Sequence, residues 1–222
     1  MPQIKDIAIT KSIARDDDFL IMQNPETGET YKITKGNLFA GFSGSGDGSS
    51  NNRHSLNFVS NGDASGLFYY LGTNKGTSNW INPAGTSVNV TASSTEAGNP
   101  TSLIDRQGSE WFSHPIANSW VSFAITSGKL LCNYYSIRSR ATNTDYYPRN
   151  WKLQGSNDGA TWIDLDIQVN NETLNAVSQW LSLPVSSNTS YSNFRIIQNG
   201  LDSSNADYFC LGEFELYGSY SS

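Results

Sequence analysis

The chain has 222 residues, of which 37% are hydrophobic and 15% are charged, and its formal net charge is −6. This acidic balance argues against nucleic-acid binding, which requires a basic face, and against binding to an anionic membrane surface. The 27 aromatic residues (six Trp, eleven Tyr, ten Phe) can fill a hydrophobic core. A polar, weakly charged sequence of this kind is typical of an all-β protein.

Two targeting signals are missing from the sequence. No apolar run reaches the roughly 18 residues of a membrane-spanning helix, and the first residues contain no apolar stretch typical of a signal peptide. We therefore expect a protein made in a cytoplasm, with no membrane partner.

Residues 1–42 have the pattern of a β-hairpin followed by a short helix, with strands at 19–23 and 30–34, a turn between them and the helix at 35–42. Pro25 and Gly28 favour the turn. A unit of this size cannot bury its apolar residues alone, so we expect it to pack on copies of itself or on another protein. The sequence therefore predicts an attachment and oligomerisation module.

The segment from Asp16 to Leu38 combines an acidic turn, an apolar strand, a Thr-Gly-Glu turn and a Lys-Ile-Thr-Lys exit. In these features it resembles N-terminal segments of bacteriophage tail-fibre and baseplate proteins. The resemblance implies a virion tail protein assembled in the host cytoplasm, a homotrimer, and contact of residues 1–42 with other tail proteins. An ordinary β-hairpin is the alternative interpretation.

Residues 43–53 are rich in Gly and Ser and predict a flexible linker. After it, short alternating apolar runs are separated by clusters of Gly, Asn, Asp, Ser and Pro, which predicts a β-sandwich or jelly roll. The runs are Leu67–Leu71, Val88–Thr91, Trp120–Ile125, Tyr134–Ile137, Trp151–Gly155, Trp162–Leu165, Trp180–Leu183, Phe194–Ile197 and Phe214–Tyr217.

Several strings in this region occur in a characteristic order. The strongest runs from Pro148 to Trp162, and the others are Ala92–Ser94, Leu103–Asp105, Trp120–Phe123, Tyr135–Arg140, Phe194–Ile196 and Leu211–Gly218. Residues 92–218 thereby resemble the discoidin domain, also called the coagulation factor V/VIII type C domain, of the galactose-binding-like superfamily. The resemblance implies a jelly-roll β-sandwich over residues 54–218, followed by a tail at 219–222. It also implies that Trp111, Trp151 and Trp162 lie in the core.

The resemblance implies that a ligand binds to loops at one end of the sandwich, and the loop that follows Arg138 and Arg140 is a candidate. Two adjacent aromatic residues, Tyr146 and Tyr147, lie on this polar loop, and exposing both is costly unless a ligand covers them. Aromatic faces and forked guanidinium donors are what saccharide binding requires. With His114 on the rim, these residues predict a site for a neutral or acidic bacterial surface saccharide. The alternatives are that one Tyr packs inward and that an Arg lies in a buried salt bridge.

Sugar-binding members of the superfamily often hold one structural calcium ion. Glu213 matches their acidic position and Asp105 lies in their first loop, so these two residues are the candidate ligands. Arg106 and Gln107 depart from the usual pattern, and Glu213 could instead pair with Arg106 or Arg138. The expectation is therefore no cofactor, with one structural Ca²⁺ as the alternative.

The sequence contains two cysteines, Cys132 and Cys210, which are not spaced as a metal motif. They are interpreted as buried free thiols, with a disulfide as the alternative. His54 and His114 have no partner at a catalytic spacing, so we expect no enzymatic activity.

Three hypotheses for function remain open. The first is a phage tail-fibre or baseplate protein whose discoidin-like head binds host surface carbohydrate during adsorption. The second is a structural, adhesion or decoration module of the tail. The third is a carbohydrate-binding accessory module.

Overall fold

The computed structural model describes residues 19–23, 30–34 and 53–222, and the chain divides into two compact units, residues 1–50 and 51–222. In the first unit, β1 (Phe19–Gln23) pairs antiparallel with β2 (Thr30–Thr34), as predicted. The predicted turn at 24–29, the helix at 35–42 and the linker up to residue 52 lie outside the described residues.

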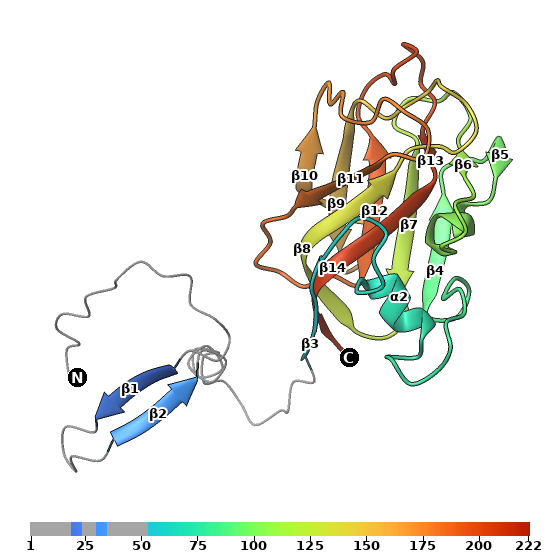
Figure 1. Cartoon of the computed structure of the whole chain (residues 1–222). Helices are drawn as coiled ribbons and strands as arrows, with labels where there is room; N and C mark the ends of the chain where they lie inside the picture. Colours follow the sequence, from blue (N-terminus) through green and yellow to red (C-terminus); the bar gives the residue numbers. More distant parts are fainter. Residues whose placement is uncertain (1–18, 24–29, 35–52) are drawn as a thin grey trace. The chain divides into compact units, whose positions relative to one another are not determined.

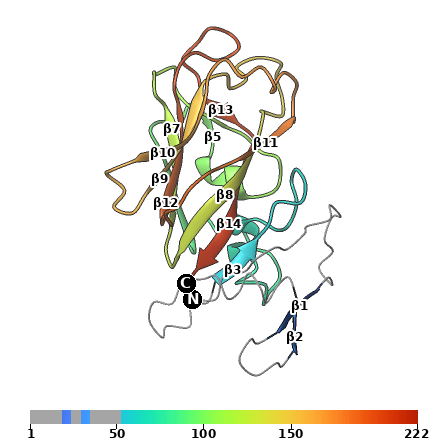
Figure 2. The same cartoon turned by 90° about the vertical axis from the view of Figure 1, so that its left-hand side faces the viewer.

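Residues 53–222 form a jelly-roll β-sandwich, which confirms the predicted fold class (Figure 1). One sheet has five strands and the other has four, and Figure 2 shows the two layers side by side. The five-stranded sheet has the order β10 (Ile163–Gln168), β9 (Trp151–Ser156), β12 (Asn193–Gln198), β7 (Trp120–Ile125) and β4 (Val88–Ala92). The four-stranded sheet has the order β11 (Trp180–Pro184), β8 (Lys129–Arg138), β14 (Glu213–Ser221) and β3 (Arg53–Leu56).

Alternating burial along the strands builds the core between these sheets. In β7 every second residue is buried, and in β12 Phe194 lies opposite Phe123 of β7. Phe123 in turn stacks on Phe214 of β14, with ring centroids 4.7 Å apart. Because paired residues on neighbouring strands share a face, these contacts fix which face of each sheet points inward.

Two of the three tryptophans predicted for the core are fully buried, Trp111 and Trp151. The prediction for Trp162 is wrong, because this residue is only half-buried. The guanidinium of Arg195 lies over its ring, 4.4 Å from the centroid. Arg195 alternates along β12 with the buried Phe194 and Ile196, so Trp162 packs on the outer face of the five-stranded sheet rather than in the core.

The apolar run predicted as a strand at residues 67–71 forms α2 (Leu67–Gly72), a short helix. Its first backbone N–H groups are capped from far away in the sequence: the amide of Phe68 donates to Glu215 Oε1 at 2.8 Å, and that of Tyr69 donates to Oε2 at 3.3 Å. A carboxylate on the last strand thus satisfies a helix start that no local residue caps. This long-range contact explains why the sequence pattern was misleading.

The sandwich also extends beyond the predicted boundary at residue 218. Strand β14 continues to Ser221, and Tyr220, predicted to lie in a tail, is 1% exposed. At the start, Arg53 belongs to β3 rather than to the linker.

Cys132 and Cys210 are buried and not bonded to each other, as interpreted from the sequence. Burial raises the pKa of both thiols to about 12. Such thiols are unreactive because the thiolate is disfavoured.

The sandwich has two ends that differ in structure. At the end called here the loop end, β8 and β12 finish and β9 and β14 begin, and a small sheet of β5 (Ala97–Gly98), β6 (Trp111–Phe112) and β13 (Cys210–Leu211) lies there. At the opposite end, the helix end, lie α2, β3 and the last residues of β14 (Figure 1). The 3₁₀ helix η1 (Pro100–Ile104) packs against β14 and β4.

Among the described residues, the structure contains no helix with the length and apolar character needed to cross a bilayer.

Candidate functional site

The loop end gathers three of the five residues predicted to bind a ligand: Arg140, Tyr146 and His114. Arg140 is 6% exposed and lies between two carboxylates. Its Nη1 donates to Asp145 Oδ1 at 2.8 Å, and its Nη2 donates to Glu110 Oε1 at 3.2 Å. The alternative of a buried salt bridge is therefore the observed one, and Arg140 is a support for the site rather than a free donor.

Two half-buried rings lie against this guanidinium and a third packs on them, and we call Phe112, Tyr146 and Tyr208 the aromatic platform. Phe112 and Tyr208 are stacked with centroids 4.6 Å apart, and the Tyr146 ring lies 4.8 Å from that of Tyr208. The carbon at the centre of the Arg140 guanidinium is 5.1 Å from the Phe112 centroid and 5.7 Å from that of Tyr146. A cation so close to the rings, and shielded from water, stabilises their arrangement.

The backbone holds Tyr146 in an unusual conformation. Its φ is +57°, a value that bulky residues rarely adopt. The loop is fixed in place by two serines of a neighbouring loop: Ser204 Oγ accepts from the Tyr146 amide at 3.2 Å, and Ser203 Oγ accepts from the Tyr147 amide at 2.9 Å. Strained backbone that is held by its surroundings occurs preferentially at binding sites.

Glu110 connects the platform to the loop that follows β8. Besides Arg140, it accepts from the Ala141 amide at 2.9 Å and from Thr142 Oγ1 at 3.0 Å. Burial alone would raise the pKa of Glu110, but these hydrogen bonds and the Arg140 charge outweigh it and lower the pKa. The carboxylate is therefore ionised at neutral pH.

His114 lies exposed at the rim of the platform. Its Nδ1 is 3.5 Å from Glu96 Oε2. Desolvation raises the pKa of the Tyr208 hydroxyl, and the nearby charges of Glu96 and Asp202 add to this effect. Glu96 thus lies between His114 and the platform.

A polar pocket of about 380 Å³ opens at the same end of the sandwich. Its lining includes Asn150, Asn170, Asn205 and Asp202. Asp202 is 5% exposed, and its Oδ2 has no hydrogen-bond partner among the described residues. Amide and carboxylate groups of this kind are suited to binding hydroxyl groups.

Two residues predicted for the site lie elsewhere. Tyr147 is buried, 4% exposed, so the inward-packing alternative applies to it. Arg138 turns away from the platform: its Nε donates to the Ser178 carbonyl at 3.4 Å, and its guanidinium lies against Gly108. The two arginines diverge because β8 ends at Arg138, so the alternation of a strand does not extend to Arg140.

The candidate calcium ligands, Asp105 and Glu213, lie near each other, and each carboxylate accepts a backbone hydrogen bond. Glu213 accepts from the Gly108 amide at 2.7 Å, whereas Asp105 Oδ1 accepts from the Gln107 amide at 2.8 Å. The charge of Asp105 raises the pKa of Glu213, and the charges of Arg138 and Arg106 lower it. Two cations beside the carboxylate supply the charge that a metal ion would bring, and no group of three or more His, Cys, Asp or Glu side chains within residues 53–222 could hold one.

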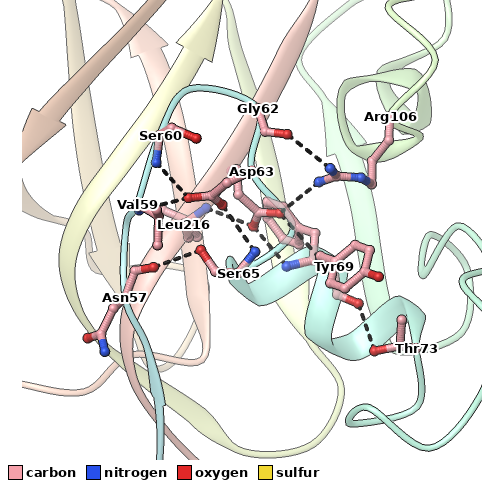
Figure 3. Close-up of polar contacts among 12 residues, drawn as sticks. Asn57, Val59, Ser60, Gly62, Asp63, Ser65, Tyr69, Thr73, Arg106 and Leu216 are labelled. Carbon is pink, nitrogen blue, oxygen red and sulfur yellow. Dashed lines mark hydrogen bonds and ion pairs between the residues drawn. The ribbon is translucent and has the colours of Figure 1, made fainter.

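Burial dominates the ionisation of Glu213 and Glu215, and it raises the pKa of each to about 7. Arg106 Nη1 lies 3.9 Å from Glu215 Oε2, and its Nη2 donates to the Gly62 carbonyl at 3.1 Å (Figure 3). The same figure shows Asp63 accepting from the amides of Val59, Ser60 and Ser65. These contacts fix the segment before α2, so this region has a structural role.

Phe112, Tyr208 and Glu110 are not among the residues predicted from the sequence to bind a ligand. All three lie far from Tyr146 in sequence. The signal that could have found two of them is that Phe112 and Tyr208 each stand next to a buried aromatic residue, Trp111 or Phe209. Because successive side chains of an extended segment point to opposite sides, Phe112 and Tyr208 are expected to point outward.

No protein-family model matches the chain. The chain is 30% identical over 178 residues to a BTB/POZ domain-containing protein of Arabidopsis thaliana, covering 73% of this chain and 22% of the relative. It is 33% identical over 175 residues to the E3 ubiquitin-protein ligase Ufd4 of Drosophila melanogaster, covering 74% of this chain and 6% of the relative. The chain therefore spans about a fifth or less of the length of these relatives.

Two solved structures share the fold. One is a CBM32 module from Clostridium perfringens in complex with GalNAc-β-1,3-galactose, with a TM-score of 0.50, 13% identity, and 60% of this chain and 96% of that chain covered. The other is the CBM32-3 module of a family 31 glycoside hydrolase from the same organism, with a TM-score of 0.51, 14% identity, and 62% and 94% covered. Both are carbohydrate-binding modules with the galactose-binding-like, discoidin-like jelly roll.

Proposed function

We propose that residues 51–222 form a non-catalytic carbohydrate-binding module that holds a neutral saccharide on the aromatic platform. The observation that carries this proposal is the set of three packed, half-buried rings at the loop end, supported from the buried side by Arg140. The C–H face of a sugar ring packs on such a surface, and polar groups around it bind the hydroxyls.

The charges around the platform favour a neutral ligand over an acidic one. Glu96, Glu110 and Asp145 lie around it, Asp202 lies close to Tyr208, and Asp207 lies close to Asp202. Arg140, the cation in contact with the rings, is buried and already paired. On the platform, a uronic acid or a sialic acid would meet these carboxylates while Arg140 is already paired, so like-charge repulsion disfavours it there. The neighbouring pocket contains one cation, Arg149, which donates to the Asn171 and Leu174 carbonyls.

The polar pocket beside the platform gives room for a second sugar unit. Ser203 lines the pocket and also accepts a hydrogen bond from the loop that carries Tyr146. A disaccharide or longer chain can thus extend from the platform toward Asn150 and Asn205. This arrangement agrees with the fold shared with a module whose solved complex contains GalNAc-β-1,3-galactose.

Calorimetric titration with neutral and acidic disaccharides, after screening on a glycan array, tests the proposal. A shallow site of this kind binds a single sugar unit weakly, with a Kd on the order of millimolar. Exchanging Tyr146 and Tyr208 together for Ala is expected to abolish binding of the neutral ligand. The matched control is Trp162→Ala, which removes a half-buried aromatic residue from the side of the five-stranded sheet. Unchanged binding by the double variant would overturn the proposal.

We further propose, from the sequence resemblance, the location of this module in a phage tail, where several copies would raise the apparent affinity by avidity. Trimer formation through residues 1–42 and contact with tail proteins belong to the same proposal. Light scattering on the full chain tests it: a monodisperse monomer would contradict the trimer. Adsorption assays with the Tyr146→Ala/Tyr208→Ala double variant test the role in host attachment.

A second candidate function is recognition of a protein partner. It is favoured by one observation, the 30% and 33% identity to segments of much longer proteins, a BTB/POZ domain-containing protein and an E3 ubiquitin-protein ligase. In this alternative the jelly roll is a docking module within a larger assembly, as in the structural or adhesion hypothesis. A glycan array with no binding, together with a protein captured by the wild type but not by the double variant, would favour this alternative.

A further inference from the structure

We propose that a groove at the helix end of the sandwich is a second binding site, which takes a small anion carried on a flat ring. The groove has a volume of about 320 Å³ and is lined by Arg53, His54, Tyr70, Lys75, Tyr220 and Ser222. A neighbouring hollow of about 180 Å³ shares His54 and Tyr70 with it and continues along β3. This site lies at the end opposite the aromatic platform and is independent of the saccharide proposal.

Flat rings form one wall of the groove. The rings of His54 and Tyr70 are stacked, with centroids 4.2 Å apart and planes inclined by 10°. Tyr220 packs edge-on against Tyr70, with centroids 5.8 Å apart. His54 is exposed and Tyr70 is half-buried, so one end of the stack is accessible to a ligand ring.

The turn after α2 places a cation beside these rings. Asn74, Lys75 and Gly76 all have positive φ, of +47°, +60° and +82°. For Lys75 this conformation is held by its amide, which donates to the Tyr70 carbonyl at 2.8 Å, and for Gly76 by its amide, which donates to Thr73 Oγ1 at 3.1 Å. As a result, Lys75 Nζ lies over the Tyr220 ring, 5.8 Å from its centroid.

A positive-φ conformation at a lysine costs free energy, and the surrounding structure must compensate for it. Here the end of α2 supplies that compensation, because a left-handed turn closed by a bond such as that from the Lys75 amide to the Tyr70 carbonyl is a common way to end a helix. The same turn brings Lys75 beside the aromatic wall.

The charged side chains of the groove are cationic, although the net charge of the chain is −6. Arg53 and Lys75 line it together with the last residue of the sequence, Ser222, and no Asp or Glu side chain is found among the described residues of its lining. Cations at a concave, aromatic surface attract anions, and this attraction becomes stronger when the ligand displaces water from the surface. The groove is large enough for one ring with its anionic substituent.

The ligand class follows from combining the two features. The rings supply a stacking surface, and Arg53 and Lys75 supply donors to a phosphate, sulfate or carboxylate attached to the stacked ring. An inorganic anion binds only to the cations, and a neutral ring binds only to the stacking surface. A ring-bearing anion uses both, so we expect it to bind more tightly than either.

Titration of the full chain, followed by NMR or calorimetry, tests this proposal with three probes: 4-nitrophenyl phosphate, inorganic phosphate and neutral 4-nitrobenzyl alcohol. We expect 4-nitrophenyl phosphate to bind about tenfold more tightly than inorganic phosphate. Lys75→Gln and Arg53→Gln are each expected to weaken it about tenfold, and His54→Ala is expected to remove the preference for the ring. Lys152→Gln, which removes a cation from β9, is the matched control and is expected to change nothing.

Two natural sources of this chemistry are distinguished by tyrosine O-phosphate and uridine 5′-monophosphate. Binding of either that is tighter than that of inorganic phosphate supports the proposal and identifies a phosphorylated aromatic side chain or a nucleotide as the ligand class. The proposal is overturned if none of the three ring-bearing anions binds, or if their binding is insensitive to Lys75→Gln and Arg53→Gln while the variants unfold like the wild type. Saccharide binding by the Tyr146→Ala/Tyr208→Ala variant is not involved in this test, so failure of one proposal leaves the other standing.

Discussion

The two ends of the sandwich use the same kinds of residue in opposite positions. At the loop end, the cation Arg140 is buried beneath Phe112 and Tyr146, and carboxylates lie at the surface. At the helix end, Lys75 lies over Tyr220, which is itself buried, and the surface charges are positive. The difference shows that an arginine or lysine near aromatic residues does not by itself determine the ligand. The ligand class depends on whether the cation or the carboxylates face the solvent.

This contrast accounts for the two proposed preferences. A paired and buried arginine stabilises a surface without offering donors to a ligand, so the loop end presents rings and carboxylates to a neutral saccharide. An exposed lysine keeps its donors free, so the helix end presents rings and cations to an anion. Variants that exchange these roles test the comparison.

The largest effect is expected for Arg140→Ala. It leaves the partly buried Glu110 and Asp145 without their partner, and we expect a loss of about 3 kcal/mol in the free energy of unfolding. Thermal unfolding should shift downward by roughly 6–12 °C. The matched variant at the helix end, Arg53→Ala, removes an exposed guanidinium and should change the stability by less than about 0.5 kcal/mol. Equal effects at the two ends would contradict the assignment of Arg140 as a buried support.

The pH dependence of stability is the next largest effect. The folded-state pKa of Glu213 and of Glu215 is about 7, above the ordinary value of 4.5, so the folded chain binds more protons than the unfolded chain between these values. The stability that these groups contribute is therefore present below about pH 4.5 and is lost as the pH rises through about 7. We expect about 2 kcal/mol for each glutamate between pH 5 and pH 8.

Glu213→Gln should remove the share of Glu213, about half of this pH dependence, because an amide does not titrate, whereas Glu215 still does. Asp158→Asn is the control: hydrogen bonds from the Thr161 and Ala160 amides lower the pKa of Asp158, so its titration falls below this window. Denaturant unfolding measured from pH 5 to pH 8 checks the prediction. A slope that Glu213→Gln does not change would show that other groups cause it.

A smaller effect on stability is expected at two turns that hold a non-glycine residue at positive φ, the turn of Lys75 and the loop of Tyr146. Lys75→Gly relieves the positive φ at the helix end and should stabilise the chain by about 0.5 kcal/mol while it weakens anion binding. Tyr146→Gly relieves the same strain at the loop end but also removes a ring from the platform. We therefore expect the second variant to be no more stable than the wild type and to lose saccharide binding. Thermal unfolding and titration of both variants measure the difference.

The sequence sufficed for the fold because the jelly roll depends on local alternation. Every second position of β7 and β12 is buried, and the turn from Ser156 to Gly159 is closed by its own residues. Both features depend only on residues that are close together in the sequence. The helix α2 was missed because its cap, Glu215, comes from the last strand. Only the folded chain brings the two segments together.

The site was predicted in part for the same reason. Tyr146 and Arg140 are near each other in the sequence, and for this reason the sequence predicts this part of the platform. Phe112 in β6 and Tyr208 in the loop before β13 complete it; they are separated by about a hundred residues, and their contact depends on the packing of the small sheet. The turn of Lys75 was not identified because a positive φ at lysine has no sequence signal.

The smallest effect is expected from removal of residues 1–50. Residues 51–222 form a separate compact unit with its own core, so we expect their thermal unfolding to change by no more than about 1 °C. Calorimetry on the shortened and full chains checks this. Loss of the cooperative transition in the shortened chain would show that the sandwich depends on the N-terminal unit.

The central claim is that the loop end binds a neutral saccharide, and amide chemical-shift mapping during titration with GalNAc-β-1,3-galactose tests it most directly. We expect shifts that saturate in the millimolar range and that concentrate around Phe112, Tyr146 and Tyr208, with none around Lys75. Shifts confined to the helix end, or no shifts up to about 20 mM of this or any other neutral disaccharide identified on the array, would contradict the claim.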